Sequence, residues 1–543
     1  MFEYKKAKTI FMIIVFHTIV LGVVLHCYKS AEIKNGQIST VEKELIQTHI
    51  NVNGKELILD AYYSEKEQAW CFTLPALYEN SKFNVVLQKK QKVLSSVERK
   101  PGESLVFLQY NDEVIPIKFL CANNVETLFV DLEELYTLED VHEDKEREVS
   151  GYMSCEDSEG QWLYLPIEVF SGHGNDSWKA SKKSYDIKFA SELDLFGMGR
   201  NQDYVLLAGY RDNSLMSFCV TGELIQQIGF AYAPEFRLVN LYIEGNYLGV
   251  YFLTEKIEID KNRIDIYSVY EETKTINGKK TLESSECECW TADNGVTKRY
   301  FYHVPENPLD ISGGYLLELD TNNRETDVSR FTSDRSNKMT LKRARYSSKE
   351  QVSYIANYWQ EFENALYSEN GYNDKGKYYA EYIDLESFAM QWLIYELLQE
   401  TSMHSSIYYY KESDIHGDGL LHACYPWDLE HSYLMNENID ELWNVKVQDE
   451  YWSQYYKHED FRVEVEKIWQ GRFVPVVERM IEKEVVWEND GFKNISGYQK
   501  ECATLYRLDG ARWSDVDSMQ KCELIREFLQ IRLDVLNDIL NKK

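Results

Sequence analysis

The sequence predicts an α+β protein in which a small β-rich unit precedes a larger mixed domain. Three observations predict it. The chain has 543 residues, more than one ordinary core organises. Short apolar segments of strand character fill residues of about 45–138. From about residue 149 further strand-like segments come first and long helical patterns follow, and strands followed by helices are typical of α+β folds.

Composition indicates packed cores and excludes several functions. Hydrophobic residues make up 44% of the chain and aromatic residues 14%, which argues against global disorder. The net charge is −31, and no basic stripe interrupts it, so we expect no nucleic-acid partner. The ten cysteines include no Cys-x-x-Cys pair, so a structural zinc site has little support.

The N-terminus predicts a membrane anchor. Thr9–Cys27 contains no charged residue, and nineteen helical residues rise about 28 Å, close to the hydrocarbon thickness of a bilayer. Lys5, Lys6 and Lys8 precede this run, which favours a cytoplasmic N-terminus and an exported remainder. A cleaved signal peptide is the alternative, but its apolar region is usually shorter. We expect residues 1–30 to form a stub and a single-pass anchor, with the bulk of the chain outside the cell.

Residues 31–148 predict a β-rich domain followed by a linker. An Asn-Gly turn lies between alternating apolar positions in residues 50–63, which is a hairpin signal. Further strand-like segments follow at short intervals, as in a small sandwich. They are residues 70–75, 83–88, 104–110, 114–120 and 127–132. The charge-dense segment Glu139–Glu148 is expected to be a linker.

The remaining residues, 149–543, predict one large domain whose first half is rich in strands. Its strand-like segments are residues 162–170, 185–190, 204–210, 237–259 and 313–320. A helical segment, residues 214–229, lies among them. Residues 271–310 are expected to be a variable polar insertion.

The second half of this domain predicts helices near residues 349–369, 385–400 and 514–540. Asp384 is a suitable N-cap for the middle helix. Apolar residues of that helix are mostly three or four apart, which predicts one apolar face. They are Phe388, Met390, Leu393, Leu397 and Leu398.

Four segments carry candidate chemistry. In Val169–Phe189 a Gly-Asn turn precedes a Lys-Lys-Ser-Tyr strand, and such a turn can bring backbone N–H groups and lysines near an anion. A hairpin with exposed lysines is the alternative. In residues 206–229 a strand, an acidic turn and a helix follow one another, and a hairpin in residues 241–260 ends near Glu255 and Lys256.

In kinases a helical Glu facing a strand Lys positions nucleotide phosphates, and Glu223 is a candidate for that Glu. The alternative is ordinary surface ion pairing. In residues 405–433, Asp428 and Glu430 follow an apolar strand within Pro-Trp-Asp-Leu-Glu. Two carboxylates so spaced suit a hard cation such as Mg²⁺, although an Asp at a strand end also caps helices.

In combination and order these segments resemble the CotH (spore coat protein H) family over roughly residues 150–540. The matching elements are the Gly-Asn-Asp-Ser-Trp turn, the Lys-Lys-Ser-Tyr strand, the strand-Asp-helix element, the Gly-Asn-Tyr-Leu-Gly-Val-Tyr hairpin, Gly-Gly-Tyr-Leu-Leu-Glu-Leu-Asp and Pro-Trp-Asp-Leu-Glu. The resemblance implies an atypical, two-lobed protein-kinase-like domain. It also implies binding of ATP with Mg²⁺ or Mn²⁺ and phosphorylation of protein side chains.

Carried onto this chain, the resemblance implies that Asp428 binds the metal and that Glu430 replaces a second Asp. Lys183 or Lys188 supplies the phosphate contact, and Glu255 and Lys256 lie near the adenine side.

The chain departs from the family at the Asn-x-Asp that usually precedes the Tyr-rich strand. Residues 398–406 contain no Asp, and Glu400 or His404 is the substitute base. The sequence therefore predicts an exported, membrane-anchored bacterial kinase that acts on a protein or cell-envelope substrate. The alternative is a pseudokinase that serves as a surface assembly or adhesion module. A glycan hydrolase is a remote third hypothesis. Such an enzyme needs two catalytic carboxylates, and the sequence shows no motif that identifies such a pair.

Overall fold

The computed structural model describes residues 46–541, except 53–54, 76–82, 90–91, 100–103, 111–112, 123–124, 157–161, 176, 210–211, 213, 321–327, 343, 402, 404, 428–431, 447–449, 488–490 and 514–517. The predicted anchor, Thr9–Cys27, lies outside these ranges. Within them no helix has both the length and the apolar character needed to cross a bilayer. The mixture of helix and sheet, with strands dominating the N-terminal part, confirms the α+β prediction.

The N-terminal strands agree with the sequence patterns. They are β1 (Ile46–Val52), β2 (Lys55–Asp60), β3 (Tyr62–Ser64), β4 (Ala69–Pro75), β5 (Phe83–Lys89), β6 (Lys92–Arg99), β7 (Ser104–Tyr110) and β8 (Glu113–Ala122). Val52 pairs with Lys55, as the predicted Asn-Gly hairpin requires. Strands β3, β4, β8 and β7 form a sheet of their own. The sequence did not predict β6, because its many polar residues leave little apolar alternation.

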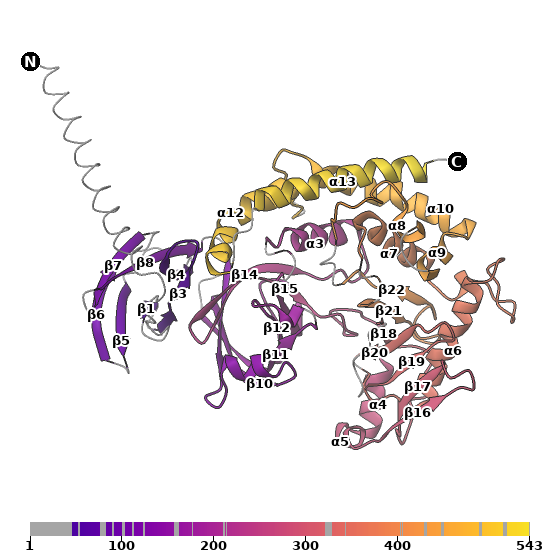
Figure 1. Cartoon of the computed structure of the whole chain (residues 1–543). Coiled ribbons are helices and arrows are strands. Elements are labelled where there is room, and N and C mark those ends of the chain that lie inside the picture. Colours follow the sequence, from indigo (N-terminus) through magenta and orange to yellow (C-terminus); the bar gives the residue numbers. More distant parts are fainter. Residues whose placement is uncertain are drawn as a thin grey trace, which may run out of the picture.

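Seven strands close into a barrel at the centre of the protein (Figure 1). They are β9 (Glu126–Leu132), β10 (Val149–Glu156), β11 (Trp162–His173), β12 (Ser184–Asp194), β13 (Arg200–Leu207), β14 (Phe236–Ile243) and β15 (Asn246–Glu255). Their order is β13-β12-β11-β10-β9-β14-β15, and β13 also pairs with β15, which closes the ring. Alternate residues such as Phe170, Tyr185 and Leu253 fill an apolar core separate from the main one.

The barrel includes strands from both sides of residue 148. The segment predicted as a linker contains helix α2 (Leu138–Glu143), which begins with a Thr137 capping box. Leu138 and Val141 of α2 are buried with the barrel core. The high charge of this segment therefore marks the outer face of a short helix, while two apolar residues hold the helix in place.

A second, seven-stranded sheet follows the barrel. Its strands are β16 (Cys287–Thr291), β17 (Lys298–Tyr302), β18 (Tyr315–Leu319), β19 (Arg330–Thr332), β20 (Lys338–Lys342), β21 (Ile407–Lys411) and β22 (Leu421–Ala423), in the order β16-β17-β19-β20-β18-β21-β22. The expected polar insertion at 271–310 contains β16, β17, most of α4 (Val269–Asn277) and all of α5 (Lys279–Glu283). It is ordered because β17 pairs with β19 and Phe301 is buried.

Helices surround this sheet and cover the barrel (Figure 1). They are α3 (Met216–Ile228), α6 (Lys349–Leu366), α7 (Leu385–Leu398), α8 (Trp443–Lys446), α9 (Glu450–Tyr455), α10 (Glu459–Ile468), α11 (Val474–Ile481), α12 (Ile495–Arg512) and α13 (Ser518–Leu540). Asp384 caps α7 as predicted, because its carboxylate accepts from Ser387 N at 3.0 Å. The prediction of a single apolar face on α7 was wrong. Every residue of Phe388–Leu398 is buried, since other elements cover the helix on all sides.

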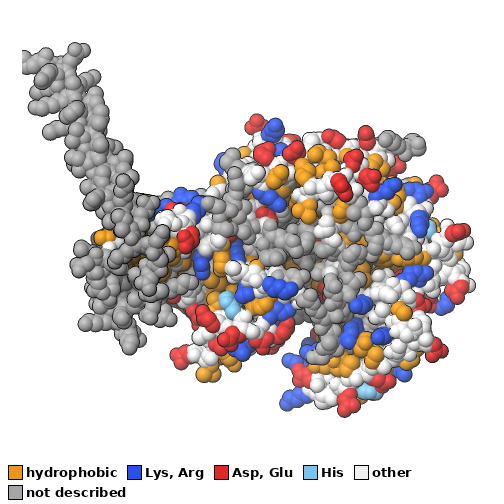
Figure 2. Space-filling view, in the orientation of Figure 1, with side chains coloured by type: hydrophobic (Ala, Val, Ile, Leu, Met, Phe, Trp, Pro, Cys, Tyr) orange, Lys and Arg blue, Asp and Glu red, His pale blue; other side chains and the backbone are white. Residues whose placement is uncertain are grey.

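Charged side chains are scattered over the described part of the face shown in Figure 2, among apolar and uncharged polar ones. Lysines and arginines are interspersed there with aspartates and glutamates.

A buried ion pair connects α13 to α7, and its removal is a test of this packing. Arg532 Nη2 lies 2.6 Å from Glu396 Oε1, and both side chains are fully buried. Replacing Arg532 by Met leaves the Glu396 carboxylate buried without its cation, which costs about 3–5 kcal/mol. We expect R532M to lower the urea midpoint of unfolding accordingly. Lys467→Met, which breaks an exposed ion pair with Glu464, is the control and should leave the midpoint unchanged. A loss in R532M no larger than the control's would contradict this account.

Candidate functional site

A cleft of about 500 Å³, including its open mouth, lies between α3, the barrel wall and residues 425–427. Its walls are mainly apolar and aromatic. The ring centroids of Phe236 and Phe252 are 4.7 Å apart, and those of Phe218 and Phe252 are 5.2 Å apart. Three residues with hydroxyl groups also line the cleft: Ser217, Thr221 and Thr254. Mainly apolar walls that carry a few polar groups are typical of small-molecule sites.

Helix α3 approaches the barrel closely because residue 222 is glycine. A Cβ atom at Gly222 would lie 2.7 Å from Cε1 of Phe236. The start of the helix is fixed by Asp212, whose carboxylate accepts from Ser217 N at 2.7 Å. The acidic turn that the sequence placed between strand and helix is therefore a cap that sets where α3 begins.

The segment that leads to the predicted metal ligands lines part of the cleft. Tyr425, Pro426 and Trp427 line it. Asp428 and Glu430 follow directly in the sequence but lie outside the described residues.

The side of the barrel wall that faces the cleft also carries charge. Asp186 pairs with Val205, and Val205 pairs with Thr254, so the three side chains lie on one face of the sheet. The Asp186 carboxylate lies 3.1 Å from His173 Nδ1 and 2.7 Å from Lys256 Nζ. Burial alone would raise the pKa of Asp186, but His173 and Lys256 outweigh it and hold this pKa below the ordinary value. Asp186 is thus a carboxylate held in its ionised form.

The two lysines proposed for phosphate contact have different surroundings. Lys183 donates to the carbonyl oxygen of Trp178 at 2.6 Å and lies over that indole ring, so it stabilises the turn. Lys188 lies two residues after Asp186 on the same face of β12, and its Nζ is 3.1 Å from Glu168. Lys188 is therefore the one of the two that lies on the cleft side of the wall.

The neighbouring Lys182, which sequence reasoning missed, is buried. Its Nζ lies 2.9 and 3.0 Å from the two oxygens of Asp509 in α12, and it donates to Val250 O at 2.6 Å. Asp509 also accepts from Val250 N at 2.7 Å. Burial lowers the pKa of Lys182 and raises that of Asp509, and the contact between them opposes both shifts. No local signal reveals this pair, since 327 positions separate its members.

The remaining predicted site residues are mostly engaged in structural contacts. The carboxylate of Glu223 accepts from Tyr498 Oη at 2.7 Å and from Gln227 Nε2 at 3.0 Å, and burial raises its pKa. Glu255 forms an ion pair with Arg263. Burial raises the pKa of Glu255 to about 7, although Arg263 acts in the opposite direction.

Glu400 lies beside the chain that follows the predicted metal ligands. Its buried carboxylate accepts from Ser432 Oγ at 2.9 Å. Leu398 O accepts from Tyr433 N at 3.2 Å, so the two segments run together. The structure therefore brings the region of the missing Asn-x-Asp next to Ser432 and Tyr433. The other candidate base, His404, lies outside the described residues.

The model of the CotH kinase protein family matches residues 170–536. The matched range includes β12, α3 and every residue that lines the cleft. No curated protein matches the chain.

The ionised state of Asp186 predicts how its removal changes stability with pH. A carboxylate whose pKa is lowered in the folded state contributes stability above its unfolded pKa, and this contribution disappears as the pH falls through the folded value. We expect Asp186→Asn to be about 1–3 kcal/mol less stable than the parent at pH 7. The difference should shrink below about pH 4, where the unfolded chain takes up the proton. Urea unfolding at both pH values measures it, and a difference that grows on acidification would contradict the assignment.

Proposed function

Because the chain belongs to the CotH kinase protein family, we propose that it is an atypical kinase that transfers phosphate from ATP to a protein or cell-envelope substrate. The proposal includes Mg²⁺ or Mn²⁺ as the metal. It also includes export and attachment to the bacterial membrane through residues 9–27.

One observation supports this proposal above the others. The residues that immediately precede Asp428 line an aromatic cleft, and its lining residue Thr254 shares one face of the barrel wall with Asp186, the partner of Lys256. An adenine ring suits the apolar part, where the partly buried rings of Phe218 and Phe236 lie on either side of the buried Phe252. The phosphates then extend toward the charged wall.

Asp428 and Glu430 are the residues that would hold the divalent ion. A bound ion neutralises charge on the phosphate oxygens during transfer. Other side chains would bind and position the nucleotide. Lys188 and Lys256 supply cationic charge, Asp186 fixes the position of Lys256, and the apolar cleft excludes water from the nucleotide.

A second candidate function is a pseudokinase that binds a nucleotide without turnover. The observation that favours it is the environment of Glu400, which is buried and hydrogen-bonded to Ser432. A general base must reach the hydroxyl group of the substrate, and loss of such a base costs about 10²–10⁴ in rate. Binding and transfer therefore have to be measured separately.

Nucleotide binding is the first test. We expect ATP with Mn²⁺ to raise the melting temperature of the purified protein, and Asp428→Ala to abolish the rise because the metal loses its ligand. Transfer of labelled γ-phosphate to the protein itself, absent in the same variant, then separates the kinase from the pseudokinase. If ATP with either metal causes no thermal shift, the protein is neither the proposed kinase nor a nucleotide-binding pseudokinase.

Occupation of this particular cleft is the second test. In Gly222→Ala the added Cβ meets the Phe236 ring, so the ring must move, which costs about 1–3 kcal/mol of stability. We expect ATP affinity to fall by about tenfold or more, as a loss of 1.4 kcal/mol in binding implies. Gly471→Ala is the control, because a Cβ there meets nothing within 4 Å. Equal ATP affinity in both variants would place the nucleotide elsewhere.

A further inference from the structure

The turn that joins β21 to β22 brings three potential metal ligands together. They are Glu412, Asp418 and His422, and one ligand atom from each lies within 4.8 Å of the others. Among the described residues this is the one such group of His, Cys, Asp and Glu side chains. Asp428 and Glu430, the ligands proposed for the nucleotide metal, are not part of it.

Each carboxylate of the group accepts a backbone hydrogen bond within the turn and also lies near the imidazole, and both oxygens of Asp418 are within 3.2 Å of His422 Nε2. Oε2 of Glu412 accepts from Asp418 N at 3.0 Å, and Oδ1 of Asp418 accepts from Leu420 N at 2.8 Å. The second oxygens, Asp418 Oδ2 and Glu412 Oε1, lie 3.0 and 4.0 Å from His422 Nε2. The turn therefore holds two carboxylates against one nitrogen.

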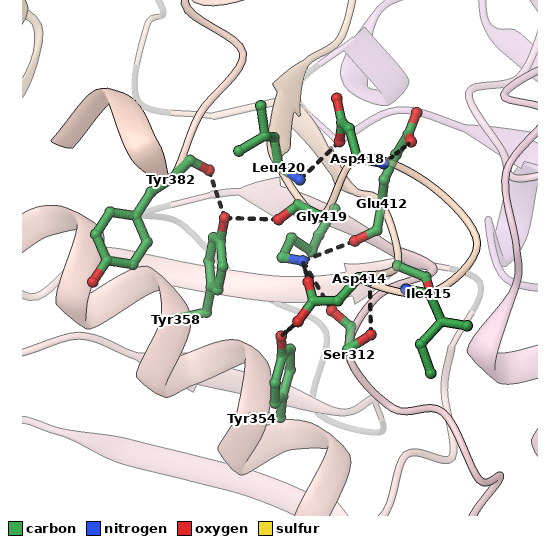
Figure 3. A network of polar contacts seen from close by, with 12 residues as sticks. Ser312, Tyr354, Tyr358, Tyr382, Glu412, Asp414, Ile415, Asp418, Gly419 and Leu420 are labelled. Atoms are coloured by element: carbon green, nitrogen blue, oxygen red, sulfur yellow. Dashed lines mark hydrogen bonds and ion pairs between the residues drawn. The ribbon is translucent and has the colours of Figure 1, made fainter. Parts of the chain in front are cut away.

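Buried contacts hold the turn itself in place (Figure 3). The buried Lys411 donates to Ser312 O at 2.9 Å and to Glu412 O at 2.8 Å, and its Nζ lies 2.9 Å from Asp414 Oδ1. From α6, Tyr358 donates to Gly419 O at 3.0 Å. The ligands are thus carried by a rigid hairpin, which lowers the entropy cost of binding an ion.

The Glu412 carboxylate can occupy its position because residue 417 is glycine. A Cβ atom at Gly417 would lie 2.1 Å from Glu412 Oε2. Any other residue at this position would displace the carboxylate.

The imidazole is oriented from its other side. Its ring stacks on Tyr410 with centroids 4.8 Å apart, and its Nδ1 lies 3.6 Å from Asp384 Oδ2. A carboxylate on the remote nitrogen of a metal-bound histidine is a common arrangement, because it fixes the ring and leaves the other nitrogen for the ion. Two carboxylates, of Asp384 and Asp418, thus lie near the two ring nitrogens of His422.

We propose that Glu412, Asp418 and His422 bind a divalent ion of the Zn²⁺ type, with Asp384 supporting the histidine. One imidazole nitrogen and two carboxylate oxygens are a ligand set of zinc, and a water completes the tetrahedron. Mg²⁺ and Ca²⁺ prefer oxygen ligands alone. Ligand atoms of a tetrahedral Zn²⁺ lie about 3.4 Å apart, so a modest movement of the Glu412 side chain closes the site.

The ion would join three parts of the fold. Glu412 follows β21, His422 belongs to β22, and Asp384 caps α7. Strand β22 continues into Tyr425, which lines the cleft. A bound ion therefore stabilises the strand that leads to the proposed nucleotide site, without taking part in phosphate transfer.

The test is zinc binding by the full-length protein in detergent, without nucleotide. Cys287 and Cys289 are exposed and offer thiol ligands of their own, so both are replaced by Ser in every sample. We expect calorimetric titration with Zn²⁺ to show a site whose dissociation constant rises at least about tenfold in Asp418→Asn and in Glu412→Gln. Both replacements keep an oxygen that can accept the hydrogen bonds of the turn. Circular dichroism confirms that they fold.

Two controls make the result specific. His303→Gln removes an exposed histidine whose Nε2 lies 3.3 Å from Glu288, and it should leave the titration unchanged. Asp428→Asn removes a ligand of the separately proposed nucleotide metal, so it can change any Zn²⁺ binding there, but the site that Asp418→Asn and Glu412→Gln weaken should remain in it. A failure of the proposed kinase function would therefore not affect this result. The proposal is overturned if the parent protein takes up no Zn²⁺, if Asp418→Asn and Glu412→Gln bind Zn²⁺ like the parent, or if His303→Gln weakens binding as much as they do.

Discussion

The contact of Asp509 with Lys182 and the backbone of Val250 holds the barrel to the C-terminal helices. One carboxylate of α12 meets an ammonium group from the start of β12 and an amide of β15, all in a buried environment. A buried charge is costly unless it is paired and hydrogen-bonded, so the three groups have to be placed together. In this way the barrel keeps a fixed position relative to the helices, and the cleft between α3 and residues 425–427 keeps its width.

The closed barrel is the second constraint on the cleft. Because β13 pairs with both β12 and β15, the register of three strands sets which side chains face α3. Asp186, Val205 and Thr254 face outward at one level, while Tyr185 and Leu206 fill the barrel. A shift of one residue in any of these strands would exchange the charged wall for an apolar one. The chemistry proposed for this wall thus depends on strand pairing that is far from the reacting groups in sequence.

Much of this organisation could be predicted from local sequence signals. The Asn-Gly turn, the alternating strands before residue 132 and the Asp384 cap of α7 follow from short-range rules. The closure of the barrel could not be predicted, because β9 and β14 are parallel neighbours more than a hundred residues apart. For α7 the local apolar pattern indicated one face, whereas tertiary contacts cover the whole helix. In the Lys-Lys-Ser-Tyr segment, the sequence identified a cluster of lysines. It could not show that Lys182 forms a buried ion pair with Asp509.

The most direct measurement is a structure of the protein with a non-hydrolysable ATP analogue and Mn²⁺. We expect the adenine ring against Phe218 and Phe236, the phosphates toward Lys188 and Lys256, and Mn²⁺ on Asp428. A nucleotide bound away from this cleft, or Mn²⁺ coordinated without Asp428, would contradict it.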